Sequence, residues 1–175
     1  LSEGGYGASI INDCKYGYGC DLNNLSLTLI KCAVYPNTEA DRELHEFTYS
    51  ILPHCGDFRE ANIAEEAYLL NQPLTVRRIS KQDGKLPDSF SFVGSNSSNI
   101  IIETVKQCEN NDSIIVRFYE YHNSHSKVTL DFGIDFDKAY ICDMLENNLN
   151  ELAKNNRSIT LDVKPYEIVT VKITK

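Results

Sequence analysis

Residues 45–73 read HEFTYSILPHCGDFREANIAEEAYLLNQP, a stretch that joins a strand pattern to a helix pattern. In its first half, Phe47, Tyr49 and Ile51 alternate with polar residues. A period of two is typical of a half-buried strand, so we expect a strand here with these three side chains on its buried face. Pro53 has no N–H to give to a sheet, and we therefore expect the strand to end there.

The second half of the stretch predicts a helix. Asn62 lies three residues before Glu65, which is the spacing of a capping box. Pro73 should end the helix, because proline cannot continue the hydrogen-bond pattern. The apolar residues recur at helical spacing and form one face: Ile63, Ala67 and Leu70. We expect this to be the only helix of the chain.

The remainder of the sequence indicates β structure. Residues 6–20 predict a strand that runs into a polar turn, Leu25 to Leu29 predict an amphipathic strand, and residues 74–76 predict a short one. Regularly spaced short strands downstream predict an antiparallel sandwich of about seven strands. These runs are residues 89–93, 99–105, 113–121, 127–132, 138–142, 158–163 and 168–173.

The chain is expected to form two β lobes, residues 1–87 and 88–175, joined by a polar connection at 80–88 that contains Gly84 and Pro87. The last strand should lie within a sheet, where each buried aliphatic side chain contributes about 1.5–3 kcal/mol. If the first lobe is only part of a larger sheet structure, unpaired strand edges should be exposed. We then expect dimerisation or aggregation through that lobe.

The charge and the distribution of apolar residues exclude some classes of binding partner. The net charge of −8 and the lack of a basic cluster argue against nucleic acid or an anionic membrane. No apolar run approaches the roughly 20 residues of a membrane-spanning helix. The start at Leu1 suggests a piece of a longer protein. Six cysteines without a C-x-x-C pair predict free, buried thiols and a reducing compartment. No signal-peptide pattern opens the chain, which fits a cytoplasmic location.

Histidines suggest one candidate site. His45 and His54, with Asp57 or Glu46, would be a metal set, but their spacing matches no local zinc signature. A histidine at a strand end, hydrogen-bonded to backbone, is the simpler interpretation. A small hydrolase built on His54 and Cys55 is a further possibility, although neighbours on a strand point to opposite faces.

A second candidate is the turn at residues 12–16, which reads Asn-Asp-Cys-Lys-Tyr. It places an amide, a carboxylate, an ammonium and a phenol at one strand end, and such groups hydrogen-bond sugar hydroxyls. Ordinary turn chemistry explains the same residues. A glycosidase pair of carboxylates among the 25 acidic residues is also possible, but the sequence does not single out a pair.

Several motifs, in order, resemble the C-terminal part of the glycoside hydrolase family 38 α-mannosidases, closest to the cytosolic and bacterial-type branch. They lie at residues 12–17, 45–49, 52–54, 56–57, 59–61, 66–68, 71–74, 140–147 and 161–168. The resemblance implies the end of a galactose-mutarotase-like supersandwich over 1–87 and a terminal immunoglobulin-like sandwich over 88–175.

The resemblance also implies what the chain contributes. Family members are retaining α-mannosidases that depend on zinc or another divalent metal, with nucleophile, acid/base and metal ligands on upstream domains. We therefore expect no catalytic residue and no metal or other cofactor here, but Asp13, Lys15 and Tyr16 near the substrate. The partners would be the N-terminal domains of the same parent chain and, through them, an α-mannoside. The alternative is a stand-alone carbohydrate-binding sandwich, which the absence of tryptophan disfavours.

Overall fold

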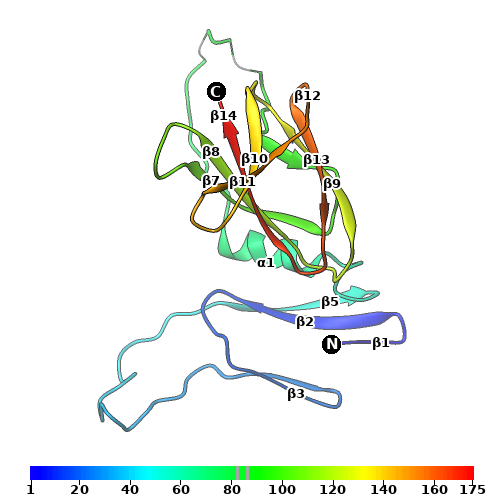
Figure 1. Cartoon of the computed structure of the whole chain (residues 1–175). Coiled ribbons are helices and arrows are strands. Elements are labelled where there is room, and N and C mark those ends of the chain that lie inside the picture. The colour runs from blue at the N-terminus through cyan, green and yellow to red at the C-terminus, as the bar shows by residue number, and fades with distance from the viewer. Residues whose placement is uncertain (82, 86) are drawn as a thin grey trace. The chain divides into compact units, whose positions relative to one another are not determined.

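The computed structural model describes residues 1–81, 83–85 and 87–175. The chain divides into two units, Leu1–Ser80 (unit 1) and Lys81–Lys175 (unit 2) (Figure 1). The expected boundary after residue 87 lies in the same polar connection, of which Gln82 and Leu86 are outside the described residues.

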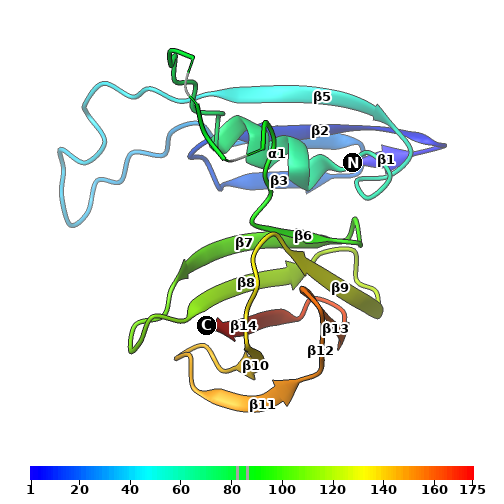
Figure 2. The ribbon, with the colours of Figure 1, turned by 90° about the horizontal axis from the view of Figure 1, so that it is seen from above.

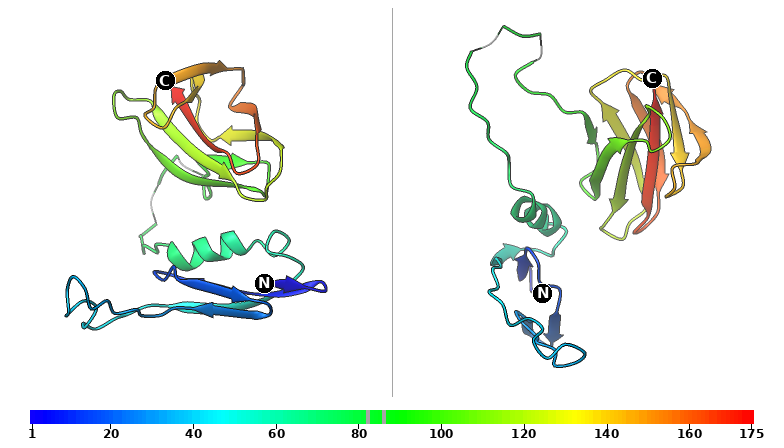
Figure 3. Two further views of the ribbon diagram at one scale, coloured as in Figure 1. Left: turned by 60° about the horizontal axis from the view of Figure 1, so that its bottom comes forward. Right: turned by 90° about the vertical axis from the view of Figure 1, so that its left-hand side faces the viewer.

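Unit 1 is built from two small antiparallel sheets and a helix. The helix lies over one face of the larger sheet and the hairpin of the smaller sheet lies on its other side (Figures 1 and 3). The larger sheet has the order β1-β2-β5, with β1 at Ser2–Glu3, β2 at Tyr6–Asn12 and β5 at Tyr49–Cys55. The smaller sheet pairs β3 (Tyr18–Asp21) with β4 (Asn24–Leu27), and the helix α1 spans Ile63–Asn71.

The strand β5 differs from its prediction in two ways. It does not stop at Pro53, which pairs with Ala8 inside the strand. Proline is tolerated because β5 is an edge strand with a single neighbour, so its nitrogen can face away from the ladder. The expected buried face is also wrong, since Tyr49 and Ile51 are 51% and 68% exposed.

The helix begins and ends where the sequence indicates, but its cap is different. Asn62 precedes the first helical residue with φ 49° and makes no side-chain cap bond. The reciprocal pattern occurs one turn earlier. There the Asp57 carboxylate accepts from the Arg59 and Glu60 amides at 2.8 and 3.2 Å, and Glu60 Oε2 accepts from the Asp57 amide at 3.1 Å. The capping box therefore shapes the turn that leads into α1.

Two strand predictions in unit 1 fail. Residues 74–76 form no strand, and Leu74 and Val76 are 87% and 91% exposed. The segment pairs with no neighbouring strand of the described chain, and strand propensity alone does not hold an extended segment in place. Likewise, β4 ends at Leu27, so Leu29 lies beyond it.

Unit 2 is a sandwich of two antiparallel sheets (Figure 2). The five-stranded sheet has the order β11-β10-β14-β8-β7, with bounds Asn148–Leu152, Lys138–Cys142, Ile168–Thr174, Ile114–Glu120 and Ile100–Gln107. The four-stranded sheet has the order β12-β13-β9-β6, with bounds Lys154–Asn155, Ser158–Val163, Ser126–Phe132 and Val93–Ser95.

The hydrophobic core lies between the two sheets of unit 2. The apolar faces expected from alternation are buried on β9, β13 and β14, and the core residues include Leu130, Leu161 and Val171. Because β14 is the central strand of its sheet, its other face is buried too, at Thr170 and Lys172. This confirms the prediction of a mainly β, antiparallel fold with one helix among the described residues.

Burial is very uneven between the units. Every fully buried apolar side chain of the described residues lies between Ile100 and Ile173, in unit 2. For the same reason the prediction of buried thiols holds only there. All six cysteines are free, but only Cys108 and Cys142 are buried, and the other four are exposed. In the described residues, no helix has the length and apolar character needed to cross a membrane.

Candidate functional site

The turn after β2 is organised by Asn12. Its side-chain oxygen accepts from the Cys14 amide at 3.0 Å and from the Lys15 amide, which closes the turn. Its side-chain nitrogen donates to the Tyr18 hydroxyl. Asn71, the last residue of α1, donates to the Asn12 carbonyl at 3.1 Å, so the helix end also fixes the turn.

Asp13 ties this turn to the segment that enters β5. Its carboxylate accepts from the Thr48 amide at 3.0 Å, and its own amide donates to the Thr48 carbonyl at 3.2 Å. The Thr48 hydrogen bond lowers the pKa of Asp13, which keeps the carboxylate ionised. Asp13 therefore holds the base of the turn.

Lys15 is half-buried beside the turn, whereas Tyr16 extends toward solvent. The ammonium of Lys15 lies 4.5 Å from the centroid of the Phe47 ring, a cation–π contact, and Tyr16 is 94% exposed. Both border a hollow of about 550 Å³, here called the turn hollow. It is lined by Cys14, Lys15, Tyr16, Gly17, Thr28, Leu29, Ile30, Lys31, Asp41 and His45.

The structure separates the histidines. Nε2 of His45 lies 2.9 Å from the Asp41 carbonyl, whereas Nε2 of His54 lies 3.1 Å from Ser9 Oγ. In the part of the chain that the structure describes, no three His, Cys, Asp or Glu side chains gather closely enough to hold a metal. The set of His45 and His54 with Asp57 or Glu46 that the sequence offers is therefore not assembled among the described residues.

Neither cysteine next to a candidate group has the features of a nucleophile. Cys55 is exposed, whereas its neighbour His54 is half-buried and bonded to Ser9, as expected for successive residues of a strand. Hydrogen bonding to the carboxylate of Asp13 raises the pKa of Cys14, which disfavours its reactive thiolate form.

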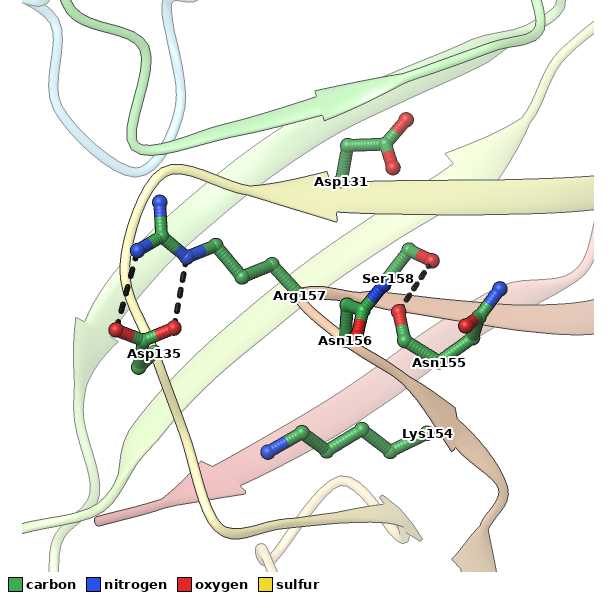
Figure 4. Close-up of a pocket in the computed structure, with 7 residues that line it drawn as sticks. All are labelled: Asp131, Asp135, Lys154, Asn155, Asn156, Arg157 and Ser158. Carbon is green, nitrogen blue, oxygen red and sulfur yellow. Dashed lines mark hydrogen bonds and ion pairs between the residues drawn. The ribbon is translucent and has the colours of Figure 1, made fainter.

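Unit 2 carries a polar hollow that no local sequence pattern indicates, here called the sandwich hollow (Figure 4). It has a volume of about 780 Å³. Its lining residues come from β9, from the loop that follows β9 and from the β12–β13 hairpin: Asp131, Asp135, Lys154, Asn155, Asn156, Arg157 and Ser158. Asn155 and Asn156 are visible in the sequence as a turn signal, but the pairing of β9 with β13 is what brings the acids beside them.

One family of known proteins matches a large part of unit 2. Residues 99–171 match the family model for the glycosyl hydrolases family 38 C-terminal beta sandwich domain. The chain is 34% identical over 176 residues to Alpha-mannosidase 2C1 of Homo sapiens, which covers 98% of this chain. This chain belongs to the C-terminal part of glycosyl hydrolase family 38.

Other relatives agree with this assignment. The chain is 31% identical over 180 residues to Alpha-mannosidase G of Dictyostelium discoideum, again across 98% of its length. A crystal structure of a family 38 protein from Enterococcus faecalis covers the whole chain with a TM-score of 0.78 at 18% identity, which shows the fold. This family 38 chain spans 17% of the human relative and 21% of the bacterial structure.

Proposed function

We propose that this chain is the non-catalytic C-terminal part of an α-mannosidase that removes terminal α-linked mannose from glycans. The observation that carries the proposal is the similarity along 98% of the chain to relatives named as α-mannosidases, two of them at 31–34% identity. Because the chain corresponds to less than a fifth of these relatives, its contribution is that of one region within a longer enzyme.

The proposal assigns bond cleavage to the rest of the parent chain. A retaining glycosidase needs two carboxylates about 5–5.5 Å apart on a rigid frame. Asp13 does not line the turn hollow, and its carboxylate already accepts a hydrogen bond from the Thr48 amide. Asp41 lines the hollow but lies on an irregular segment outside the strands. We assign the nucleophile, the acid/base and the ligands of a zinc or similar divalent ion to the parent region outside these residues.

Lys15 and Tyr16 are the proposed contribution of this chain to substrate binding. Both border the turn hollow and carry polar groups, an ammonium donor and an exposed phenol that donates and accepts. Asp13 supports them by fixing the turn to Thr48. In the parent enzyme this turn would form part of the rim of the mannose-binding cleft.

Unit 1 is the proposed contact with the rest of the parent chain. Tyr6, Tyr49 and Ile51 are 51–68% exposed on the strands β2 and β5, and the unit has no fully buried apolar side chain of its own. Apolar surface of this kind favours association with another protein surface. The six free thiols favour a cytoplasmic, reducing environment for the parent enzyme.

Complementation tests the proposal. The upstream region of the parent gene is produced separately, and activity on an aryl α-mannoside is measured in zinc or cobalt with and without this chain. We expect turnover only when both parts are present. Full activity of the upstream region alone would show that the chain does not complete the enzyme.

A substitution in the same assay tests the role of the turn. Tyr16→Phe removes one hydroxyl, and loss of one hydrogen bond to substrate is worth about 1 kcal/mol, or roughly a five-fold rise in KM. Tyr166→Phe, at an exposed tyrosine of unit 2, is the matched control and should leave KM unchanged. An unchanged KM for Tyr16→Phe would remove Tyr16 from the binding site.

A further inference from the structure

The sandwich hollow of unit 2 is a second concave polar surface, built by residues outside the turn at 12–16 (Figure 4). We propose that it binds a neutral saccharide of the α-mannoside class. The choice of mannose rests on the proposed function, whereas the choice of a neutral, polyhydroxylated ligand rests on the side chains of the hollow.

The charges of the hollow balance. Its lining has two carboxylates, Asp131 and Asp135, and two cationic groups, Lys154 and Arg157. A phosphate would be repelled by the acids and a divalent cation by the bases, and neither ion gains from a site without net charge. A neutral polyol meets no such penalty, because it uses the same groups as hydrogen-bond donors and acceptors.

One side of the hollow is held rigid. Arg157 binds Asp135 through two parallel bonds, from Nε to Oδ1 at 2.7 Å and from the guanidinium NH2 to Oδ2 at 3.1 Å. This bidentate pair fixes the plane of the guanidinium, which has five N–H donors, and leaves some of them for a ligand. Lys154 is also fixed, since its ammonium donates to the Phe136 carbonyl and lies 4.8 Å from the centroid of the Phe136 ring.

The other side offers free polar groups. The Asp131 carboxylate makes no hydrogen bond or ion pair within the described residues, and Asp131 is exposed on β9. Asn155 and Asn156 carry their amides at the β12–β13 turn, where Asn156 has φ 53° and Ser158 Oγ donates to the Asn155 carbonyl at 2.9 Å. Neither asparagine side chain takes part in these contacts, and both residues are exposed.

This combination matches a sugar ring. Each sugar hydroxyl donates and accepts, so adjacent hydroxyls pair with a carboxylate acceptor and with guanidinium or amide donors. The volume of about 780 Å³ lies within the range of small-molecule sites. Because no aromatic ring is among the lining residues, binding depends on exposed hydrogen bonds, and we expect a Kd on the order of 1 mM or weaker.

Chemical-shift mapping tests the inference. The 175-residue chain, labelled with ¹⁵N, is titrated with methyl α-mannoside to tens of millimolar. We expect saturable shifts at the amides of Asp131, Asp135 and residues 154–158. Absence of saturable shifts at these amides overturns the proposal. So does inorganic phosphate producing these shifts when the mannoside does not, because the site is then an anion site.

Substitutions inside and outside the sandwich hollow test whether the mannoside binds there. Asp131→Ala, or Asp131→Asn if the alanine variant folds poorly, should weaken the titration at least five-fold. The matched control is Asp162→Ala, at an exposed aspartate of β13 outside the hollow, which should leave it unchanged. Equal effects of both substitutions overturn the assignment. Micromolar affinity would instead favour a dedicated carbohydrate-binding module.

The readout is separate from that of the proposed function. Shifts at residues 14–17 and 45 would report the turn hollow in unit 1. If complementation succeeds but methyl α-mannoside causes no saturable shifts at the sandwich hollow, the saccharide site is overturned and the proposed function is kept. Saturable sandwich-hollow shifts without complementation leave a saccharide site on a chain that does not complete a mannosidase.

Discussion

Glu120 is 1% exposed at the end of β8, and its carboxylate is surrounded by donors. Burial raises the pKa of a carboxyl group, but hydrogen bonds from the Tyr166 amide, the Asn99 side chain, the His122 amide and Ser124 Oγ outweigh it and lower the pKa of Glu120 to about 2. The Tyr166 bond, at 3.0 Å, links β8 to the turn before β14. One ionised side chain therefore joins several loops of unit 2.

The depressed pKa makes unit 2 sensitive to acid. In the unfolded chain the carboxyl binds its proton near pH 4.5, so the stabilisation is complete above that pH and is lost as the pH falls toward about 2. A shift of this size corresponds to about 3 kcal/mol. Glu120→Gln should lose this dependence, measured by urea unfolding at pH 7 and pH 3, whereas Glu103→Gln on the edge strand β7 should keep it. Parallel acid limbs for Glu120→Gln and the unsubstituted chain would contradict the assignment.

Asp13 is predicted to act on the turn at residues 12–16 through Thr48. Asp13→Ala removes the 3.0 Å bond to the Thr48 amide and leaves that N–H without its acceptor. Hydrogen exchange at that amide should therefore speed up. Asp21→Ala, at an exposed aspartate of β3, should have no effect on Thr48. Unchanged exchange in the Asp13 variant would mean that the carboxylate does not hold the turn.

At the scale of elements, β14 is the central strand of its sheet, paired with β10 and β8. It offers a matched pair of isoleucines, since Ile173 is 1% exposed and Ile168 is 61% exposed. Ile173→Ala should lower the free energy of unfolding by about 2–5 kcal/mol because it leaves a cavity in the core. Ile168→Ala should change it by less than about 0.5 kcal/mol. Similar losses from both, measured by urea unfolding, would contradict the placement of β14.

Strands with a strong apolar alternation were predictable from the sequence, and others were not. β10 and β13 both have the predicted bounds, and along β13 buried positions alternate with more exposed ones. β11 and β12 are exposed along most of their length, so no periodic signal marks them. The prediction that the strand ends at Pro53 was wrong because the sequence does not show that β5 lies at a sheet edge. A proline inside a strand is tolerated at such an edge.

The candidate sites were also predictable only where their residues are neighbours in the sequence. The turn at 12–16 was predictable because its polar groups are contiguous in the sequence. That Asp13 serves the backbone rather than a ligand depends on Thr48, 35 residues away. The sandwich hollow joins Asp131 and Asp135 to residues 154–158 only through the pairing of β9 with β13, which no local pattern reveals.

For the whole molecule, the two units differ in how they are stabilised. Unit 2 has a closed core, whereas the apolar surface of unit 1 is exposed and its edge strand β5 has a free side. Exposed strand edges and apolar faces promote self-association. We predict that the full chain associates in sedimentation velocity at high concentration and that residues 88–175 alone stay monomeric. A monomeric full chain under these conditions would contradict the role given to unit 1.

Our central proposal is that this chain forms part of an α-mannosidase and does not carry its catalytic groups. The most direct measurement is hydrolysis of an aryl α-mannoside by the purified 175-residue chain, with zinc or cobalt supplied. We expect a rate equal to that of the blank. Metal-dependent turnover clearly above the blank would contradict it, because the catalytic groups would then lie within these residues.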